Sequence, residues 1–336
     1  MRLRIVFCGL LLAAANVCAG EMVSPDWLKI VAFAAHQTNY SGVFVYQYDD
    51  SVKTSRITHV VEPDSEYEKL ESMDGPKREI ISHHGQVWSY DNHKMVQLDS
   101  QRGRGRFPFL LPEQLSALNE NYQVKEMGME RVAGYNAQVV LFQPKDSLRY
   151  AHKIWTHTDS GLLLKAAVLG DKNQMVEQYT FTQLQIGGKI DRSWVKRSAA
   201  AVSRDAGLPV PPEKAKSVTP IKSGWVVDSL PSGFKKTMEV QRQSRSRHVP
   251  ITQLVFSDGL SAISVFIETA DADEDDAEGL SSRGAVNMYR KVMDLNLVTV
   301  VGEVPPRTVI QVLNSVRYNG SHSDNGSHSD SFFGLW

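Results

Sequence analysis

Residues 41–48, SGVFVYQY, decide the fold class, because aromatic residues occupy every second position from Phe44 onward. Phe44, Tyr46 and Tyr48 would fall on the same face of an extended segment. A period of two in β-branched and aromatic residues is typical of a strand that is buried on one side. This stretch therefore predicts a strand with an aromatic face.

Similar extended segments follow this stretch, with few helical segments between them. A helix is predicted before it, from Pro25, because Trp27, Ile30, Val31 and Ala34 have helical spacing. The further predicted strands are 56–62, 66–73, 77–82, 86–90, 94–98, 122–129, 137–143, 151–157, 162–169 and 176–184. The fold class is therefore α+β: a large curled antiparallel sheet, or half-open barrel, with covering helices, plus a smaller α+β C-terminal domain.

Periodicity is lost over residues 198–222, which are small, polar and rich in proline, as in an interdomain linker. Residues 223–318 are predicted to form the smaller domain. Its strands are 251–256, 262–268 and 297–302, with a turn at Asp258-Gly259. A helix starting at Pro305-Pro306 is predicted to bury Val309, Val312, Leu313 and Val316. Residues 319–336 repeat NGSHSD and are predicted to be a flexible tail.

The first residues are charged, then apolar, then small, as in a secretory signal peptide. Residues 1–19 are predicted to be that peptide, and the first domain is predicted to span 20–197. Both cysteines, Cys8 and Cys18, lie in the signal peptide, so the mature chain is predicted to hold no disulfide or thiolate metal site. The net charge of -1 gives no reason to expect nucleic acid as a partner.

No constellation of residues in the sequence predicts catalysis. Ser193 and Lys196 match the Ser-x-x-Lys of penicillin-recognising enzymes, but no Lys-Thr-Gly accompanies them, which favours coincidence. Asp271, Asp273 and Asp275 are spaced as in a calcium loop, yet aspartate stands where that loop needs its glycine. We therefore predict that the protein is not an enzyme and has no cofactor or metal.

Two surfaces are candidates for ligand or partner binding. The apolar, proline-bracketed stretch 107–112 could cover the aromatic face of the sheet as a flap. The candidate lipid pocket comprises Phe44, Tyr46, Tyr48, Phe107, Phe109, Leu110 and Leu111, with filling of the barrel core as the alternative. The candidate contacts for an acidic partner or lipid headgroup are Lys235, Lys236, Arg242, Arg245 and Arg247, with a solvated basic face as the alternative.

Several segments together resemble the RseB/MucB family of regulators. In the first domain they are DWL at 26–28, GVFVY at 42–46, MDGPKRE at 73–79 and FTQL at 181–184. In the second they are LPSGF at 230–234, SDGL at 257–260, SVFIE at 264–268 and VTVVGEVP at 298–305. The structural family motif within them comprises Asp74, Gly75, Pro76, Arg78, Glu79, Asp258, Gly259, Gly302 and Glu303. The specificity lies in their order and spacing over residues 25–318.

The resemblance implies a first domain similar to the periplasmic lipoprotein carriers and a second domain that grips an anti-sigma factor. It implies a periplasmic negative regulator of the sigma-E envelope-stress response. The expected partners are the periplasmic segment of an inner-membrane anti-sigma factor, which is shielded from its first protease, and lipopolysaccharide or another acylated ligand, which relieves the block. The alternative is a periplasmic lipid or lipoprotein carrier, which needs only the first domain. The sequence does not decide whether the protein forms a homo-oligomer.

Overall fold

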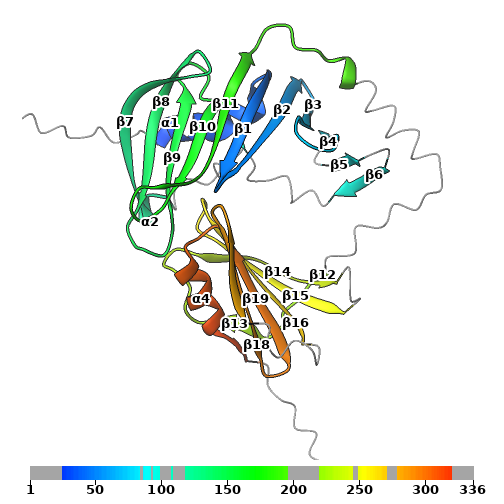
Figure 1. Cartoon of the computed structure of the whole chain (residues 1–336), viewed down its shortest axis with the longest axis vertical. Helices are drawn as coiled ribbons and strands as arrows, with labels where there is room; N and C mark the ends of the chain where they lie inside the picture. Colours follow the sequence, from blue (N-terminus) through cyan, green and yellow to red (C-terminus); the bar gives the residue numbers. More distant parts are fainter. Residues whose placement is uncertain are drawn as a thin grey trace, which may run out of the picture.

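The computed structural model of the chain describes residues 25–83, 86–91, 94–98, 107–108, 118–195, 219–244, 249–270 and 278–319. Figure 1 shows two sheets, the larger above the smaller, with the larger built from the earlier part of the chain. Within the described residues no helix is long and apolar enough to cross a membrane.

The larger sheet has eleven strands in the order β6-β5-β4-β3-β2-β1-β11-β10-β9-β8-β7. Neighbouring strands are antiparallel, and β6 and β7 stand at opposite ends of the order, so the described sheet does not close. The strands are β1 Tyr40–Tyr48, β2 Ser51–Glu62, β3 Ser65–Ser72, β4 Arg78–His83, β5 Gln86–Asp91, β6 Lys94–Leu98, β7 Tyr122–Val132, β8 Tyr135–Pro144, β9 Ala151–His157, β10 Leu163–Leu169 and β11 Met175–Ile186. The predicted large, half-open antiparallel sheet is confirmed.

Helix α1 (Pro25–Gln37) covers one face of this sheet, which we call the inner face (Figure 1). Its buried Leu28 and Val31 belong to the same core cluster as Phe44 and Phe181 of the sheet. Because apolar burial is the main favourable term in folding, this shared cluster fixes the helix on the sheet.

A close approach between β1 and β11 requires glycine at position 42. A Cβ atom added to Gly42 would lie 2.6 Å from the carbonyl oxygen of Gln183 and 2.9 Å from the ring of Phe181. The GVFVY segment therefore combines an aromatic face with the one residue small enough to let the Phe181 ring lie flat against it.

The end of α1 is tied to β3 through a carboxylate that two histidines share. His36 Nδ1 and His59 Nε2 each lie 2.9 Å from Oε1 of Glu66. Burial of Glu66 opposes its ionisation, but the hydrogen bonds with His36 and His59 outweigh this and lower its pKa to about 2. The contact therefore joins the helix, β2 and β3 electrostatically.

The turn between β3 and β4 has the conformation that its sequence requires. Gly75 has a φ of +70°, a region that other residues adopt only with strain. Ser72 Oγ donates a hydrogen bond of 2.8 Å to the carbonyl oxygen of Asp74, and the Thr54 N–H donates to the Asp74 carboxylate. The family-motif residues Asp74 and Gly75 therefore connect the turn to β2.

The smaller sheet has seven strands in the order β12-β14-β15-β16-β19-β18-β17, and β13 and β20 form a separate two-stranded ribbon. Helix α4 (Pro306–Asn314) packs on β18 and β19. The strands are β12 Thr219–Pro220, β13 Trp225–Val227, β14 Lys235–Gln243, β15 Pro250–Ser257, β16 Ala262–Thr269, β17 Gly279–Arg283, β18 Val286–Met293, β19 Asn296–Gly302 and β20 Val316–Tyr318. Gly302, whose added Cβ would lie 3.0 Å from the Ala262 carbonyl oxygen, permits close packing of β19 on β16.

The predicted closing helix is partly wrong. It buries Val309, Val312 and Leu313 as expected, but it ends at Asn314, and Val316 belongs to β20. Ser315 has the backbone angles of a helix end, and β20 pairs with β13 from Val316 onward. A helical spacing of apolar residues therefore continued past the true helix end into a strand.

Other predictions fall partly or wholly outside the described residues. These are the signal peptide 1–19, the repeat tail from residue 320, and most of the linker 198–222. Thr219 and Pro220, at the end of that linker, pair with β14. Helix α2 (Leu118–Asn121) directly precedes β7. The domain bounds stay predictions.

Candidate functional site

The aromatic face predicted for residues 41–48 continues onto the neighbouring strand. We call this set the aromatic wall: Phe44, Tyr46 and Tyr48 of β1 with Tyr179 and Phe181 of β11. Phe44 is paired with Phe181 and Tyr46 with Tyr179 in the strand register. The ring centroids are 5.9 Å apart in the first pair and 4.3 Å apart, with stacked rings, in the second. Such pairs stabilise the sheet beyond their buried area.

Phe107 fills the space in front of this wall. Its ring centroid lies 5.2 Å from that of Phe44, 5.0 Å from Phe181 and 5.5 Å from Tyr179, on which it stacks. Phe107 is only 4% exposed. Of the seven residues predicted to line a lipid pocket, the structure therefore brings Phe44, Tyr46, Tyr48 and Phe107 together. Phe109, Leu110 and Leu111 lie outside the described residues.

The wall becomes polar toward its end, where it meets the second domain. Tyr46 Oη donates a hydrogen bond of 2.8 Å to Glu177 Oε2, and Ala285 N–H donates one of 3.1 Å to the same oxygen. Burial of Tyr46, together with the neighbouring Tyr179 and Glu177, raises the pKa of its hydroxyl well above the usual value. Tyr46 therefore stays a neutral donor to the carboxylate.

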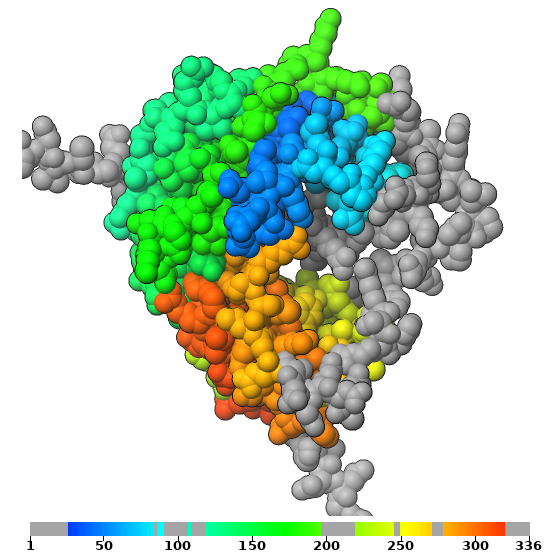
Figure 2. Space-filling model, viewed as in Figure 1, coloured from blue at the N-terminus to red at the C-terminus, as the bar shows by residue number. Residues whose placement is uncertain are grey.

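Ala285 belongs to the tight turn between β17 and β18, which we call the hairpin turn, residues 283–285. Arg283 donates hydrogen bonds from Nε and Nη2 to Tyr48 Oη, at 3.0 and 2.6 Å. Gly284 N–H approaches Asp49 Oδ2 at 3.4 Å. Figure 2 shows β1 and the hairpin side of the second domain in surface contact. The hairpin turn thus lies against the aromatic wall.

A second contact between the domains is a buried ion pair. Arg149 Nη1 donates to Asp258 Oδ2 at 2.6 Å, and both side chains are fully buried, at 0% exposure. Tyr122 Oη donates to the same oxygen at 2.9 Å. Arg149 Nη2 also donates to the Ser232 carbonyl oxygen at 2.5 Å, and its other partner is Asp146. All three guanidinium nitrogens of Arg149 therefore donate to an acceptor.

The β8–β9 loop, residues 145–150, supplies most of the first domain's part of this second contact. The Leu148 carbonyl oxygen accepts a hydrogen bond of 2.8 Å from Thr308 Oγ1. Tyr150 Oη accepts one of 3.0 Å from Asn287 Nδ2, which also donates to the Val304 carbonyl oxygen at 2.8 Å. Three consecutive residues of the loop, with Arg149 between these two, therefore bind the second domain.

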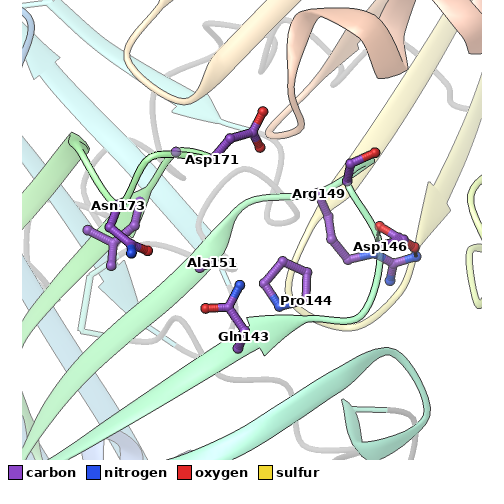
Figure 3. A pocket seen from close by; sticks show the side chains of 10 residues that line it. Gln143, Pro144, Asp146, Arg149, Ala151, Asp171 and Asn173 are labelled. Atoms are coloured by element: carbon purple, nitrogen blue, oxygen red, sulfur yellow. Dashed lines mark hydrogen bonds and ion pairs between the residues drawn. The ribbon is translucent and has the colours of Figure 1, made fainter.

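A small polar cavity of about 380 Å³ lies beside this loop. In Figure 3 Asp146 and Arg149 approach each other on one side, and Asp171 and Asn173 stand on the turn opposite. Asp171 is already paired with Arg307 of α4. The charged residues that line the cavity are already paired within the protein. We therefore interpret the cavity as a gap beside the domain contact and not as a ligand site.

His152 is a half-buried polar side chain close to the ion pair. It follows the loop on β9, and its ring makes an edge contact with the Tyr122 ring at 6.3 Å. Its Nε2 is buried and has no hydrogen-bond partner among the described residues. Burial lowers the pKa of His152 to about 4, so the ring is neutral at neutral pH.

The five predicted basic contact residues differ in exposure, and the structure describes only three of them. Lys235 and Lys236 are exposed on β14, and Lys236 is paired with Glu239 of the same strand. Arg242 is half-buried farther along β14. Arg245 and Arg247 lie outside the described residues. Among described residues no group of three histidine, cysteine or acidic side chains could hold a metal ion.

Sequence reasoning missed the domain contact. Asp258 and Gly259 were identified as a turn and as part of the family motif, but not as a domain contact, although Asp258 binds Arg149 across 109 positions of the chain. Arg149, Tyr122 and the hairpin turn were not identified at all. An arginine between Leu148 and Tyr150 was the one signal available, and arginine is the side chain best suited to buried ion pairs.

The two sheets, their order along the chain and the docked turns define a two-domain α+β protein. Residues 24–199 match the MucB/RseB N-terminal domain family, and residues 219–317 match the MucB/RseB C-terminal domain family. The chain belongs to the MucB/RseB family.

Similar proteins span nearly the whole chain. The sigma factor AlgU regulatory protein MucB of Pseudomonas aeruginosa is 33% identical over 297 residues, which cover 87% of this chain and 90% of that protein. The sigma-E factor regulatory protein RseB of Escherichia coli is 24% identical over 315 residues, covering 93% and 96%. A crystal structure of MucB in complex with MucA(peri) matches with a TM-score of 0.67 at 28% identity, over 89% of this chain and 100% of that one.

Proposed function

We propose that this protein is a periplasmic negative regulator that binds the periplasmic segment of an inner-membrane anti-sigma factor. The observation that carries the proposal is the match to MucB, which covers both domains at 33% identity. A structure of the Pseudomonas aeruginosa MucA/MucB complex, 30% identical, aligns with a TM-score of 0.70 over 88% of this chain and 99% of that one. Because the match covers both domains, we propose the same kind of partner for this chain.

Binding is proposed to shield the anti-sigma factor from its first protease and so to repress a sigma-E-type envelope-stress response. A bound folded protein protects a segment because proteolysis requires an extended, accessible backbone. In the test, the purified periplasmic segment is incubated with that protease, with and without this protein. Slower cleavage in its presence is expected, and an unchanged cleavage rate at saturating protein would reject the shielding role.

The exposed lysines of β14 are proposed as part of the partner surface. Charge complementarity across an interface steers association and contributes to specificity. The variant Lys235→Glu/Lys236→Glu should bind the anti-sigma segment several-fold more weakly. The matched control is Lys172→Glu/Lys189→Glu, which makes the same charge change at two exposed lysines of the first domain. Equal loss in both variants would remove the assignment to β14.

The aromatic wall supports a lipid or another acylated molecule as the effector that releases the partner. Ligand sites of this kind are mostly apolar with a few polar groups, and the wall ends at the Tyr46–Glu177 hydrogen bond. Coupling between two ligands is reciprocal. If lipopolysaccharide weakens binding of the anti-sigma segment tenfold, the segment must weaken binding of lipopolysaccharide tenfold. Each ligand's affinity is measured with and without the other ligand. If neither affinity changes, lipopolysaccharide does not release the anti-sigma segment from this protein.

The same wall favours a second candidate function, a periplasmic lipid or lipoprotein carrier. A carrier would need only the first domain. Acyl-probe binding that is indifferent to the anti-sigma segment, together with no binding of that segment, would favour the carrier.

A further inference from the structure

The aromatic wall is not open to a ligand in the described arrangement. Phe44 is 6% exposed and Phe181 is 2% exposed, and both lie in one core cluster with Phe107. An acyl chain gains free energy only from apolar surface that it removes from water. An entering ligand must therefore displace a part of the protein that now covers the wall.

A residue of the second domain also packs on the core that contains the wall. Leu260 packs against the same cluster as the aromatic wall. It is held in place by Asp258, whose Oδ1 accepts the N–H of Leu260 at 3.0 Å and of Ser261 at 2.8 Å. The turn that carries the family motif SDGL thus inserts an apolar side chain into the first domain.

The polar contacts around this turn hold it there. Asp258 uses its other oxygen, Oδ2, for Arg149 and Tyr122 of the first domain. One carboxylate therefore shapes the turn with one oxygen and anchors it with the other. Removal of Leu260 from the cluster requires that the Asp258–Arg149 ion pair separate.

The hairpin turn covers the polar end of the same wall. Glu177 Oε2 accepts hydrogen bonds from Tyr46 and from the N–H of Ala285. A Cβ atom added to Gly284 would lie 2.6 Å from that oxygen and 3.1 Å from Tyr48 Cβ, so a larger residue here would require the Glu177 carboxylate to shift. Gly284 also has a φ of +56°, which favours glycine.

We propose that the second domain is a built-in competitor of the acyl ligand: the hairpin turn covers the polar end of the aromatic wall, Leu260 packs on the core cluster that contains the wall, and an acyl chain binds there only when the second domain undocks. This inference rests on the proposed lipid response and names its mechanism. Lipid binding and domain docking are then mutually exclusive, so the ligand changes the partner-binding domain without touching it.

The test is a disulfide that locks the hairpin turn to the wall. The variant Tyr48→Cys/Gly284→Cys places two Cβ atoms about where a disulfide requires them, roughly 3.5–4.5 Å apart after a small adjustment. Produced from residue 20, this variant contains no other cysteine, because the natural two are Cys8 and Cys18. The matched control is the same protein in its reduced form, and the ligand probe is a dansyl-labelled undecanoic acid.

The oxidised protein should bind the probe at least tenfold more weakly than the reduced protein, which corresponds to ~1.4 kcal/mol. A second variant, Leu260→Ala, weakens docking without a cross-link and should bind the probe more tightly than the unaltered chain. Equal binding by oxidised and reduced protein, or unchanged binding by Leu260→Ala, overturns the inference and leaves the lipid response intact. Failure of the reduced variant, of Leu260→Ala and of the unaltered chain alike to bind the probe overturns the lipid response and the inference with it.

Discussion

The two contacts between the domains use the same kind of donor in opposite surroundings. Arg149 of the first domain binds Asp258 where both side chains are fully buried. Arg283 of the second domain binds Tyr48 through a guanidinium that is exposed on the hairpin turn. The distances are alike, at 2.6 Å for the shortest bond in each case.

Burial, rather than hydrogen-bond length, sets what each contact contributes. A buried carboxylate that loses its cation cannot recover water, so breaking that pair costs much more than the pair contributes net. An exposed guanidinium that loses its acceptor is hydrated at once. The Asp258 contact should therefore fix the domain arrangement, and the hairpin contact should adjust it.

The largest expected effect follows from removal of Arg149. Arg149→Met leaves Asp258 buried without a countercharge, and we expect the free energy of unfolding to fall by ~3–5 kcal/mol. Chemical denaturation of the full chain measures this. Adding Asp258→Asn keeps an acceptor for the turn and removes the charge, so the double variant should recover part of the loss. A loss below ~1 kcal/mol in the single variant would show that burial does not strengthen this contact.

Acid should weaken the buried contact before the exposed one. The folded pKa of His152, about 4, lies below the unfolded value of about 6.5. Its neutral form is therefore favoured by folding, and stability is greatest above pH ~6.5 and falls as the pH drops toward 4. Asp258 opposes this shift in part, and Arg149 balances that charge.

Between pH 7 and pH 5 we expect the free energy of unfolding to fall by ~2 kcal/mol through His152. The variant His152→Gln cannot titrate, so its stability should change less over the same interval. Denaturant melts at both pH values give the difference. Equal changes in the free energy of unfolding for the two proteins would mean that burial does not lower the pKa of His152.

A turn far from both contacts provides a comparison of intermediate size. Gly75→Val places a β-branched residue at a φ of +70°, and the free energy of unfolding should fall by ~1 kcal/mol or more. No atom lies within 4 Å of an added Cβ there, so the cost is conformational and not steric. Thermal melts of Gly75→Val and of Gly75→Ala test this, and an unchanged melting temperature in both would refute it.

The smallest expected effect is at the hairpin turn. Tyr48→Phe removes the acceptor of Arg283 and keeps the aromatic ring in the wall. Because the guanidinium stays hydrated, we expect a stability change within the scatter of replicate melts. A change as large as that of Arg149→Met would contradict the proposed difference between the two contacts.

Strands were predictable because their signal is local. A period of two is visible within six to eight residues, and the predicted segment 151–157 coincides with β9. The pair β17 and β18 was missed, since GLSSR, the sequence of β17, has no apolar alternation and its burial pattern is mostly exposed. Edge strands of this kind are formed by tertiary pairing, which single segments do not encode.

The candidate site was predictable only in part, for the same reason. The shared face of Phe44, Tyr46 and Tyr48 follows from their spacing. The approach of the hairpin turn to that face depends on how two folded domains dock. No sequence period links Arg149 to Asp258, so the contact that positions the second domain required the three-dimensional structure.

Isothermal titration of the full chain, produced from residue 20, with the periplasmic segment of its anti-sigma factor measures the proposed binding itself. We expect saturable binding with a Kd below ~1 μM at neutral pH. No detectable binding at about 100 μM segment, by a protein that melts cooperatively, would contradict it.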